Sequence, residues 1–339
     1  MKKINLFVLA VMALTACTKQ QTTGIHLENL DTTAVAQNDF YQYACGGWMK
    51  NNPIPDEYSR FGSFDKLGLS NLEQVNGLIA DIAAGTHKMG SIPQKIGDVY
   101  NLSMDTARRN QEGIAPVLPV LQEIENVTDK AQWSEVLGKA MDFGLWAMYV
   151  DADAMNSSMN ILNEYQAGFA LSQKDYYIDE DEHTKHIREE YVKHVEKMFE
   201  LFGQENAAEK AQTVLRLETR LANAALSNVE LRDPVANYNK MSVEELQKLV
   251  PEVDWKVYFA GLNIAPDSLS VGQVRHLQEA GKMLAEESLE DMKTLFTWQV
   301  IDGSADFLTE EIFMQNFEFY GRILSGRQEP TPLWKRAVA

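Results

Sequence analysis

The segment from Ile187 to Gly203, IREEYVKHVEKMFELFG, decides the fold class. Its apolar residues recur at intervals of 4, 4, 3 and 4 positions, at Ile187, Tyr191, Val195, Met198 and Phe202. This spacing places them on one face of an α-helix, which predicts a long amphipathic helix packed on a core. Gly203 then suits the left-handed conformation with which many helices end.

Helical signals continue on both sides of this segment. The next apolar stripe comprises Val214, Leu217, Leu221 and Ala224. Ser91 precedes Ile92-Pro93 as an N-cap, and Ser242 with Glu245 forms a capping box before another helix. We expect further helices from about Val271 to Phe296, from Thr309 to Leu324, and for a short stretch after Pro332.

One region breaks the helical pattern. Leu145–Val150 and Met159–Glu164 are typical of two strands, joined by a turn near Asn156-Ser157-Ser158. The sequence shows no repeat of fixed period, which argues against a solenoid. The sequence therefore predicts a mainly α fold with a small β-hairpin element.

The N-terminus carries the features of an export signal. Met1-Lys2-Lys3 precedes an apolar run from Ile4 to Met12, and Leu14-Thr15-Ala16 leads to Cys17. A basic start, a short apolar segment and small residues at its end are typical of a secretory signal peptide. Leu-Thr-Ala-Cys also resembles the lipobox of bacterial lipoproteins. We expect residues 1–16 to be removed and Cys17 to carry acyl chains that anchor the protein to a membrane; the alternative is an ordinary signal with Cys17 incidental.

The charge of the remaining chain limits its partners. Removal of Lys2 and Lys3 changes the formal net charge from −18 to −20. This charge argues against nucleic acid as a partner, because its phosphates are bound by clustered Lys and Arg. Residues 17–36 are polar and predict a flexible tether. A start without Asp after Cys17 is similar to lipoproteins addressed to the outer membrane, so we expect the periplasmic side of a bacterial membrane.

Five segments, in order along the chain, resemble one protein family. They are DFYQYACGGWMK (Asp39–Lys50) followed by Ile54-Pro55, SRFGSFD (Ser59–Asp65), Lys174-Asp175-Tyr176-Tyr177, the block from Arg232-Asp233-Pro234 to Ser242, and Trp334-Lys335-Arg336. Together they resemble the N-terminal half of the neprilysin and endothelin-converting-enzyme family of zinc endopeptidases. The resemblance implies that residues 37–339 form helical lobes of a two-lobed peptidase acting on oligopeptides.

The resemblance also indicates what this sequence does not contain. Zinc in that family is held by a His-Glu-x-x-His helix and a later Glu, whereas none of the six histidines here is followed by Glu. We expect no catalytic residue, metal ligand or cofactor in this chain, with zinc bound by a C-terminal half beyond the end of this sequence. His183, His186 and His194 lie near Asp181, Glu182 and Glu189 and are eligible ligands, but this mixture favours a solvated acidic helix face.

The same resemblance assigns substrate contact to Arg60 and Asp65. In the similar enzymes, Arg and Asp at these positions line the subsites near the substrate's C-terminal end. A guanidinium can bind carbonyl or carboxylate oxygens through two N–H groups, and Asp65 would orient it or tune preference by repulsion. Gly68 stands where a second Arg is often found, which removes one reason to expect carboxylate selectivity. Residue chemistry alone leaves a weak loop ion pair as the alternative.

The motif around Cys45 has several interpretations. By itself the lone cysteine is a small buried hydrophobe, whereas in similar enzymes it pairs with a cysteine of the C-terminal half. Gly46-Gly47 predicts a tight turn. We expect Tyr43 and Trp48 to be core residues.

Three functions stay open on these grounds. The first is the N-terminal portion of a membrane-tethered metalloendopeptidase, inactive alone. The others are a peptide-binding lipoprotein without activity and a subunit that needs a separate zinc-bearing chain.

Overall fold

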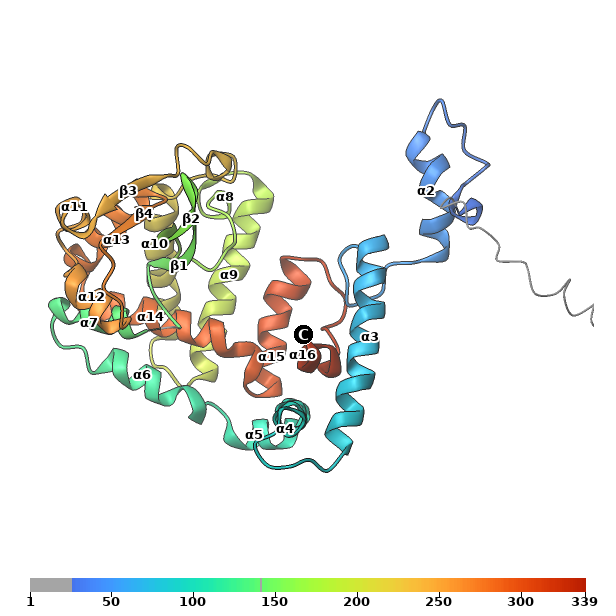
Figure 1. The fold of residues 1–339 in the computed structure, drawn as a ribbon, viewed down its shortest axis with the longest axis horizontal. Coiled ribbons are helices and arrows are strands. Elements are labelled where there is room, and N and C mark those ends of the chain that lie inside the picture. The colour runs from blue at the N-terminus through green and yellow to red at the C-terminus, as the bar shows by residue number, and fades with distance from the viewer. Residues whose placement is uncertain (1–25, 141) are drawn as a thin grey trace, which may run out of the picture. The chain divides into compact units, whose positions relative to one another are not determined.

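The computed structural model describes residues 26–140 and 142–339, so Cys17 and the predicted signal peptide lie outside the described residues. The chain divides into two compact units, residues 1–69 and 70–339 (Figure 1). Helices dominate both, which confirms the mainly α prediction. Among the described residues, no helix combines the length and the apolar composition that crossing a membrane would need.

The first unit is built on one helix and the segments that flank it. It contains the 3₁₀ turn η1 (Leu27–Asn29), helix α2 (Phe40–Asn51) and the beginning of α3 (Ser63–Ala84), which continues into the second unit. Asp39 caps α2 by accepting a hydrogen bond from the backbone N–H of Gln42 at 2.8 Å. The side chain of Gln42 in turn donates to Asp31 at 2.8 Å and so ties the segment after η1 to α2.

The second unit contains the remaining elements. Its helices are α4 (Ile92–Met104), α5 (Thr106–Glu112), α6 (Leu118–Glu125), α7 (Trp133–Lys139), α8 (Asp175–Ile178), α9 (Glu182–Leu201), α10 (Ala207–Ala224), α11 (Val243–Leu249), α12 (Trp255–Gly261), α13 (Val274–Glu286), α14 (Leu289–Ser304), α15 (Glu310–Asn316) and α16 (Leu333–Val338). Single 3₁₀ turns lie at Ala115–Val117, Lys130–Gln132, Glu230–Arg232 and Ala305–Phe307, and Phe317–Ile323 is π-helical.

The core forms around α9, α10 and α14, which run close together in Figure 1. All five residues of the first predicted stripe are buried on α9 or at its end, and those of the second are buried on α10. Gly203 has φ of +69°, as its position after the helix requires. The N-caps Ser91 and Ser242 and the capping box with Glu245 are confirmed as well.

The β element is larger than predicted. Strands β1 (Trp146–Asp153) and β2 (Asn156–Gln166) form the expected antiparallel hairpin. Its turn lies at residues 154–155 rather than 156–158, because Asp153 accepts the backbone N–H of Met155 at 2.9 Å and closes the chain earlier. Strands β3 (Asn239–Ser242) and β4 (Ser268–Val271) extend it to a four-stranded sheet of order β1-β2-β4-β3, in which β2 and β4 are parallel.

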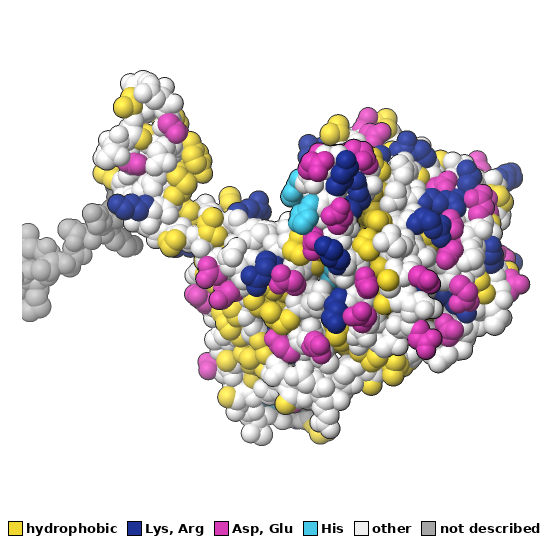
Figure 2. Space-filling view, turned by 180° about the vertical axis from the view of Figure 1, so that it is seen from behind, with side chains coloured by type: hydrophobic (Ala, Val, Ile, Leu, Met, Phe, Trp, Pro, Cys, Tyr) yellow, Lys and Arg dark blue, Asp and Glu magenta, His cyan; other side chains and the backbone are white. Residues whose placement is uncertain are grey.

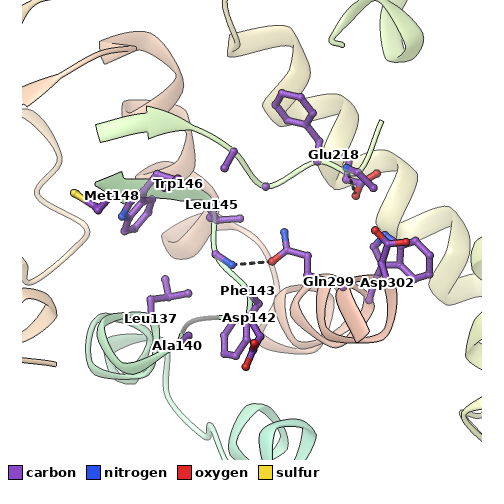
Figure 3. A pocket seen from close by; sticks show the side chains of 18 of the residues that line it. Leu137, Ala140, Asp142, Phe143, Leu145, Trp146, Met148, Glu218, Gln299 and Asp302 are labelled. Atoms are coloured by element: carbon purple, nitrogen blue, oxygen red, sulfur yellow. Dashed lines mark hydrogen bonds between the residues drawn. The ribbon is translucent and has the colours of Figure 1, made fainter. Parts of the chain in front are cut away.

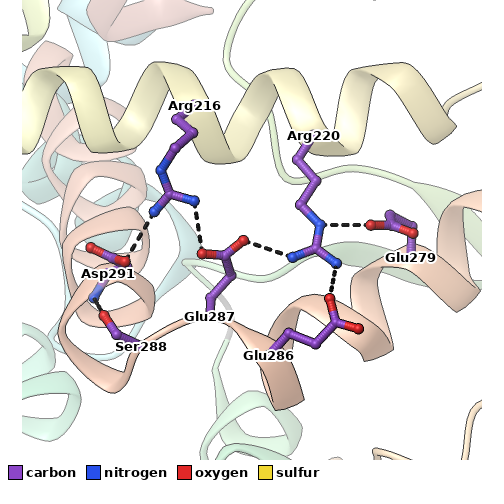
Figure 4. Close-up of polar contacts among 7 residues, drawn as sticks. All are labelled: Arg216, Arg220, Glu279, Glu286, Glu287, Ser288 and Asp291. Atoms are coloured by element: carbon purple, nitrogen blue, oxygen red, sulfur yellow. Dashed lines mark hydrogen bonds and ion pairs between the residues drawn. The ribbon is translucent and has the colours of Figure 1, made fainter.

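The predicted helix from Val271 to Phe296 is two helices, α13 and α14. Ser288 ends the continuity, because its hydroxyl caps α14 by accepting the N–H of Asp291 at 3.0 Å. The neighbouring carboxylate of Glu287 lies between Arg216 and Arg220 of α10, at 2.7 Å from a nitrogen of each (Figure 4).

Arg220 is the centre of this ion-pair network. It also binds Glu279 and Glu286 of α13, so that α10 holds both helices at their junction. Burial opposes its charge, yet the three carboxylates raise the pKa of Arg220 further above its usual range. These ion pairs therefore stabilise the break between α13 and α14. The spacing of apolar residues along the sequence does not indicate such contacts with another helix.

Candidate functional site

The motif that carries the family resemblance builds a cavity in the first unit. A cavity of about 830 Å³ lies between α2 and the segment that returns from Asn52 to the start of α3. The half-buried Trp48 lines it and stacks on Phe61, with ring centroids 6.2 Å apart and planes inclined by 25°. Trp48 is therefore a wall of the cavity and not, as predicted, a core residue.

The two glycines of this motif lie inside α2, which corrects the predicted turn. A Cβ on Gly47 would stand 2.7 Å from the carbonyl oxygen of Leu30 and closer still to that of Glu28. The backbone around η1 thus packs directly on the helix at a position that no side chain can share. Sequence reasoning found the glycine signal but assigned it to a turn, because a distant segment makes the contact.

Arg60, for which the resemblance implies a substrate contact, lies at this cavity, and the contact itself stays a prediction. It lines the cavity in the first unit, its side chain is exposed, and it forms no ion pair with any residue between 26 and 339 that the structure describes. Its guanidinium is therefore available to an external acceptor. The weak loop ion pair considered from residue chemistry is not formed within that part of the chain.

Asp65 has a defined structural partner. Its carboxylate accepts the backbone N–H of Gly62 at 2.8 Å, which satisfies a free donor at the start of α3. The hydrogen bond fixes the first turn of α3 and hence the segment that carries Arg60. A contact of Asp65 with substrate stays a prediction.

Cys45 lies at the same cavity as Arg60. Its thiol is free and partly exposed, so the interpretation as a buried hydrophobe is wrong for this structure. A pairing with a cysteine elsewhere is untested.

A second cavity, in the second unit, was missed by sequence reasoning. It has a volume of about 460 Å³ and is lined by Phe143, Trp146, Glu218, Trp298 and Asp302 among others (Figure 3). Gln299 accepts the backbone N–H of Gly144 at 2.9 Å across its wall. Figure 3 shows the carboxyl groups of Glu218 and Asp302 on the same side of this cavity.

Glu218 is buried and receives three hydrogen bonds. The hydroxyls of Tyr177 and Tyr191 donate to it at 3.0 and 2.7 Å, and the backbone N–H of Ala170 donates at 3.2 Å. Each tyrosine hydroxyl also accepts an N–H, from Leu171 and from the Trp298 indole respectively, which leaves its own O–H available to donate to Glu218. Tyr177 belongs to the Lys174–Tyr177 motif, which therefore acts structurally by binding a loop to α9 and α10.

The electrostatics of this second cavity follow from burial. Desolvation raises the pKa of Glu218 to about 8, although its tyrosine partners oppose the rise, and raises the pKa of Asp302 to about 7. The sequence does contain a signal for this buried carboxyl, because Glu218 lies next to Leu217 of the apolar stripe on α10. A carboxyl on a buried helix face needs hydrogen-bond donors around it.

The histidines do not assemble into a metal site. His183 and His186 are exposed on α9, whereas His194 is buried and its ring stacks on Phe319 at 5.0 Å between centroids. Burial lowers the pKa of His194 to about 3. Within residues 26–140 and 142–339, no group of three or more His, Cys, Asp or Glu side chains is placed to hold a metal ion. The described side chains therefore do not fit the zinc ion of the resembling enzymes.

Comparison with known proteins identifies the family. Residues 36–339 match the sequence profile of peptidase family M13, so the chain belongs to that family. It is 24% identical over 334 residues to human endothelin-converting enzyme 1, which covers 94% of this chain and 43% of that protein. It is 30% identical over 325 residues to mouse endothelin-converting enzyme-like 1, which covers 90% and 42% respectively.

Solved structures confirm the fold. The zinc metalloprotease Zmp1 of Mycobacterium tuberculosis, in complex with an inhibitor, superposes with a TM-score of 0.88 at 30% identity, covering 93% of this chain and 49% of that chain. PepO from Lactobacillus rhamnosis shows the same fold with a TM-score of 0.75 at 20% identity, covering 90% and 49%. The chain spans about half the length of the relatives that it matches, in agreement with the predicted N-terminal half.

Proposed function

We propose that this chain supplies the substrate-binding N-terminal portion of a neprilysin-like zinc metalloendopeptidase for oligopeptides, with the catalytic zinc carried elsewhere. The observation that carries the proposal is Arg60, an exposed guanidinium without an ion-pair partner among the described residues, at the aromatic cavity that the family motif builds. Such a group binds a peptide carbonyl or a terminal carboxylate through two N–H groups. Asp65 supports it by fixing the start of α3.

Peptide binding by Arg60 tests this assignment. A fluorescently labelled oligopeptide should bind the purified chain saturably in an anisotropy titration, and Arg60→Ala should weaken binding about tenfold, the effect of one lost charge-assisted hydrogen bond. Arg232→Ala, which changes an exposed arginine of the second unit, should bind as the wild type does. Equal affinities for all three proteins would refute the role of Arg60.

Hydrolysis by the chain alone is not expected. None of its histidines is followed by Glu, so a His-Glu-x-x-His zinc helix cannot form from this sequence. A quenched fluorescent peptide should stay uncleaved with the pure chain and added zinc. Chelator-sensitive turnover would overturn the proposal.

A second candidate function, completion by a separate zinc-bearing chain, is favoured by the surface of the first unit. Phe40, Phe64 and Leu67 expose 69%, 87% and 57% of their surface, and Figure 2 shows hydrophobic side chains gathered on that unit. Large apolar side chains exposed to this degree are typical of a contact with another polypeptide. Activity that appears on co-expression with such a chain, with a disulfide through Cys45, would distinguish this function from simple peptide capture.

The location is part of the same proposal. Residues 1–16 would act as a lipoprotein signal, Cys17 as the acylated residue and the following residues, up to η1, as the tether to the periplasmic face of a bacterial membrane. The predicted tether of residues 17–36 is too long, because Leu27–Asn29 are helical and the backbone of Glu28 and Leu30 packs on Gly47 of α2. Cells grown with a clickable palmitate analogue should label the wild type and Cys45→Ser but not Cys17→Ser. Labelling of Cys17→Ser would contradict the anchor.

A further inference from the structure

Two arginines of the second unit face a cavity that is separate from both cavities described above. Arg109 lies on α5 and Arg336 on α16, and both line a hollow of about 470 Å³. Leu102, Phe307, Leu333 and Ala337 supply its apolar walls. Arg108 lines it as well, so the hollow combines three positive groups with apolar surface.

Each of these guanidinium groups has a buried nitrogen without an acceptor. Within the described part of the chain, neither Nη2 of Arg109 nor Nε of Arg336 has a hydrogen-bond partner. The adjacent Arg108, by contrast, donates through Nε to Glu112 at 2.7 Å. A buried N–H of a charged group that lacks an acceptor is costly, so the two free donors indicate a missing acceptor.

The surroundings hold Arg336 in place. Its guanidinium lies 3.6 Å from the ring centroid of Phe313, and its Nη1 donates to the carbonyl oxygen of Asp306 at 3.4 Å. Burial and the like charge of Arg109 lower the pKa of Arg336, while the carboxylates of Glu310 and Asp306 oppose the shift. Two mutually repelling cations fixed in this way would be stabilised by an anion between them.

The acidic residues at this cavity are already engaged. Asp105 accepts the backbone N–H of Arg108 at 2.9 Å, Glu112 binds the side chain of Arg108, and Asp306 accepts the side-chain amide of Asn316 at 3.0 Å. Their negative charges also disfavour a ligand with two charges. A group with one negative charge and two acceptor oxygens suits the two free N–H donors best.

We propose that this cavity binds a monocarboxylate with an adjoining apolar group. Its two oxygens would accept from Arg109 and Arg336, and its apolar part would lie against Leu102 and Leu333. A peptide C-terminus and a free carboxylic acid share this chemistry. The site is independent of the peptide contact proposed for Arg60.

Arginine side-chain NMR on the whole chain tests the site directly. In a ¹⁵N-labelled sample, N-acetylleucine should shift Arg Nε–H signals saturably, while the neutral N-acetylleucinamide should not. 4-Methylpentanoate, which lacks a peptide group, separates the two sources: equal binding indicates a free carboxylic acid, and much weaker binding indicates a peptide C-terminus. A shift that is non-saturable, or the same for the amide, would overturn the proposal.

Variants assign the site to its residues. Arg109→Gln should weaken N-acetylleucine binding about tenfold or more, the effect of one charge-assisted hydrogen bond. Arg322→Gln is the matched control, because Arg322 also donates through Nε to a carboxylate four residues away, that of Glu318 at 2.9 Å, but does not line this cavity, and it should bind as the wild type does. Retained affinity in a folded Arg109→Gln protein, with native circular dichroism, would refute the assignment. Arg60→Ala should leave N-acetylleucine binding unchanged. A failure of this carboxylate site can therefore be distinguished from a failure of the peptide contact proposed for Arg60.

Discussion

The buried carboxyl groups of Glu164 and Glu218 differ in the hydrogen bonds they receive. Glu218 accepts from two tyrosines and one backbone N–H. Glu164, on β2, accepts one backbone N–H, from Gln273 at 3.2 Å, and its Oε1 has no partner within the described residues. Burial raises the pKa of Glu164 to about 8, so its carboxyl is protonated in the native protein near neutral pH.

Glu164 should make stability depend on pH. The native state holds a proton that the unfolded chain loses near pH 4.5, so its stabilising effect is complete below that pH and is lost as pH rises to about 8. In that window the free energy of unfolding should fall by about 1.4 kcal/mol per pH unit from this group. In Glu164→Gln this pH-dependent contribution is absent. Urea unfolding of both proteins between pH 5 and 8.5 should therefore show a free energy of unfolding that falls more steeply with pH in the wild type, by about 1.4 kcal/mol per pH unit. Parallel pH profiles would contradict the prediction.

At the scale of single elements, local sequence signals predict where helices begin, and contacts with residues distant in sequence decide how far helices and strands extend. The caps at Ser91 and Ser242 act locally and were predicted correctly. The break between α13 and α14 combines the local cap at Ser288 with ion pairs to Arg216 and Arg220 of α10, which are distant in sequence. Strands β3 and β4 are short segments whose partners are remote, so neither shows an alternation long enough to recognise.

Gly47 and Gly68 provide a matched test of helix packing in the first unit. A Cβ on Gly47 would overlap the backbone of the η1 segment, whereas a Cβ on Gly68 meets no atom within 4 Å. Gly47→Ala should destabilise the first unit by about 2 kcal/mol or more, and Gly68→Ala should be neutral or stabilising by up to about 1 kcal/mol. Fluorescence of Trp48, which stacks on Phe61, should show the first unit unfolding at a lower urea concentration in Gly47→Ala than in the wild type. Equal unfolding midpoints would show that the η1 contact is not tight.

At the scale of the whole molecule, charge and apolar exposure are distributed differently. Lys, Arg, Asp and Glu are interspersed over the visible face of the second unit in Figure 2, while the first unit exposes large apolar side chains. Mixed charge on a surface favours solubility, and an exposed apolar group favours association. The chain by itself therefore has a surface that another polypeptide can cover.

Self-association should originate at that apolar surface. We expect light scattering after gel filtration to show concentration-dependent oligomers of the wild type, and Phe64→Ser with Leu67→Ser to reduce them. Met89→Ser is the control, because Met89 is 90% exposed but lies in the second unit, between α3 and α4. Oligomers that persist in the double variant, or disappear in the control, would place the association elsewhere.

The candidate site was predicted in part. The sequence pointed to the segment with Arg60 and to the glycines of α2, because family motifs are local. The cavity of Glu218 and Asp302 and the pair Arg109 and Arg336 were not predicted. Each joins side chains from elements far apart in the chain, and no local pattern records which of them meet.

By itself, the sequence determined the mainly α fold class, the family and its extent, and the main helix caps. These follow from periodicity, capping chemistry and ordered motifs, which are all local or linear in the chain. The tertiary structure alone decided that Gly47 receives the backbone of η1, that Glu218 is bound by two tyrosines, and that two arginines share a cavity. Burial and electrostatic fields depend on which distant segments pack together, and this is why they emerge only in the folded chain.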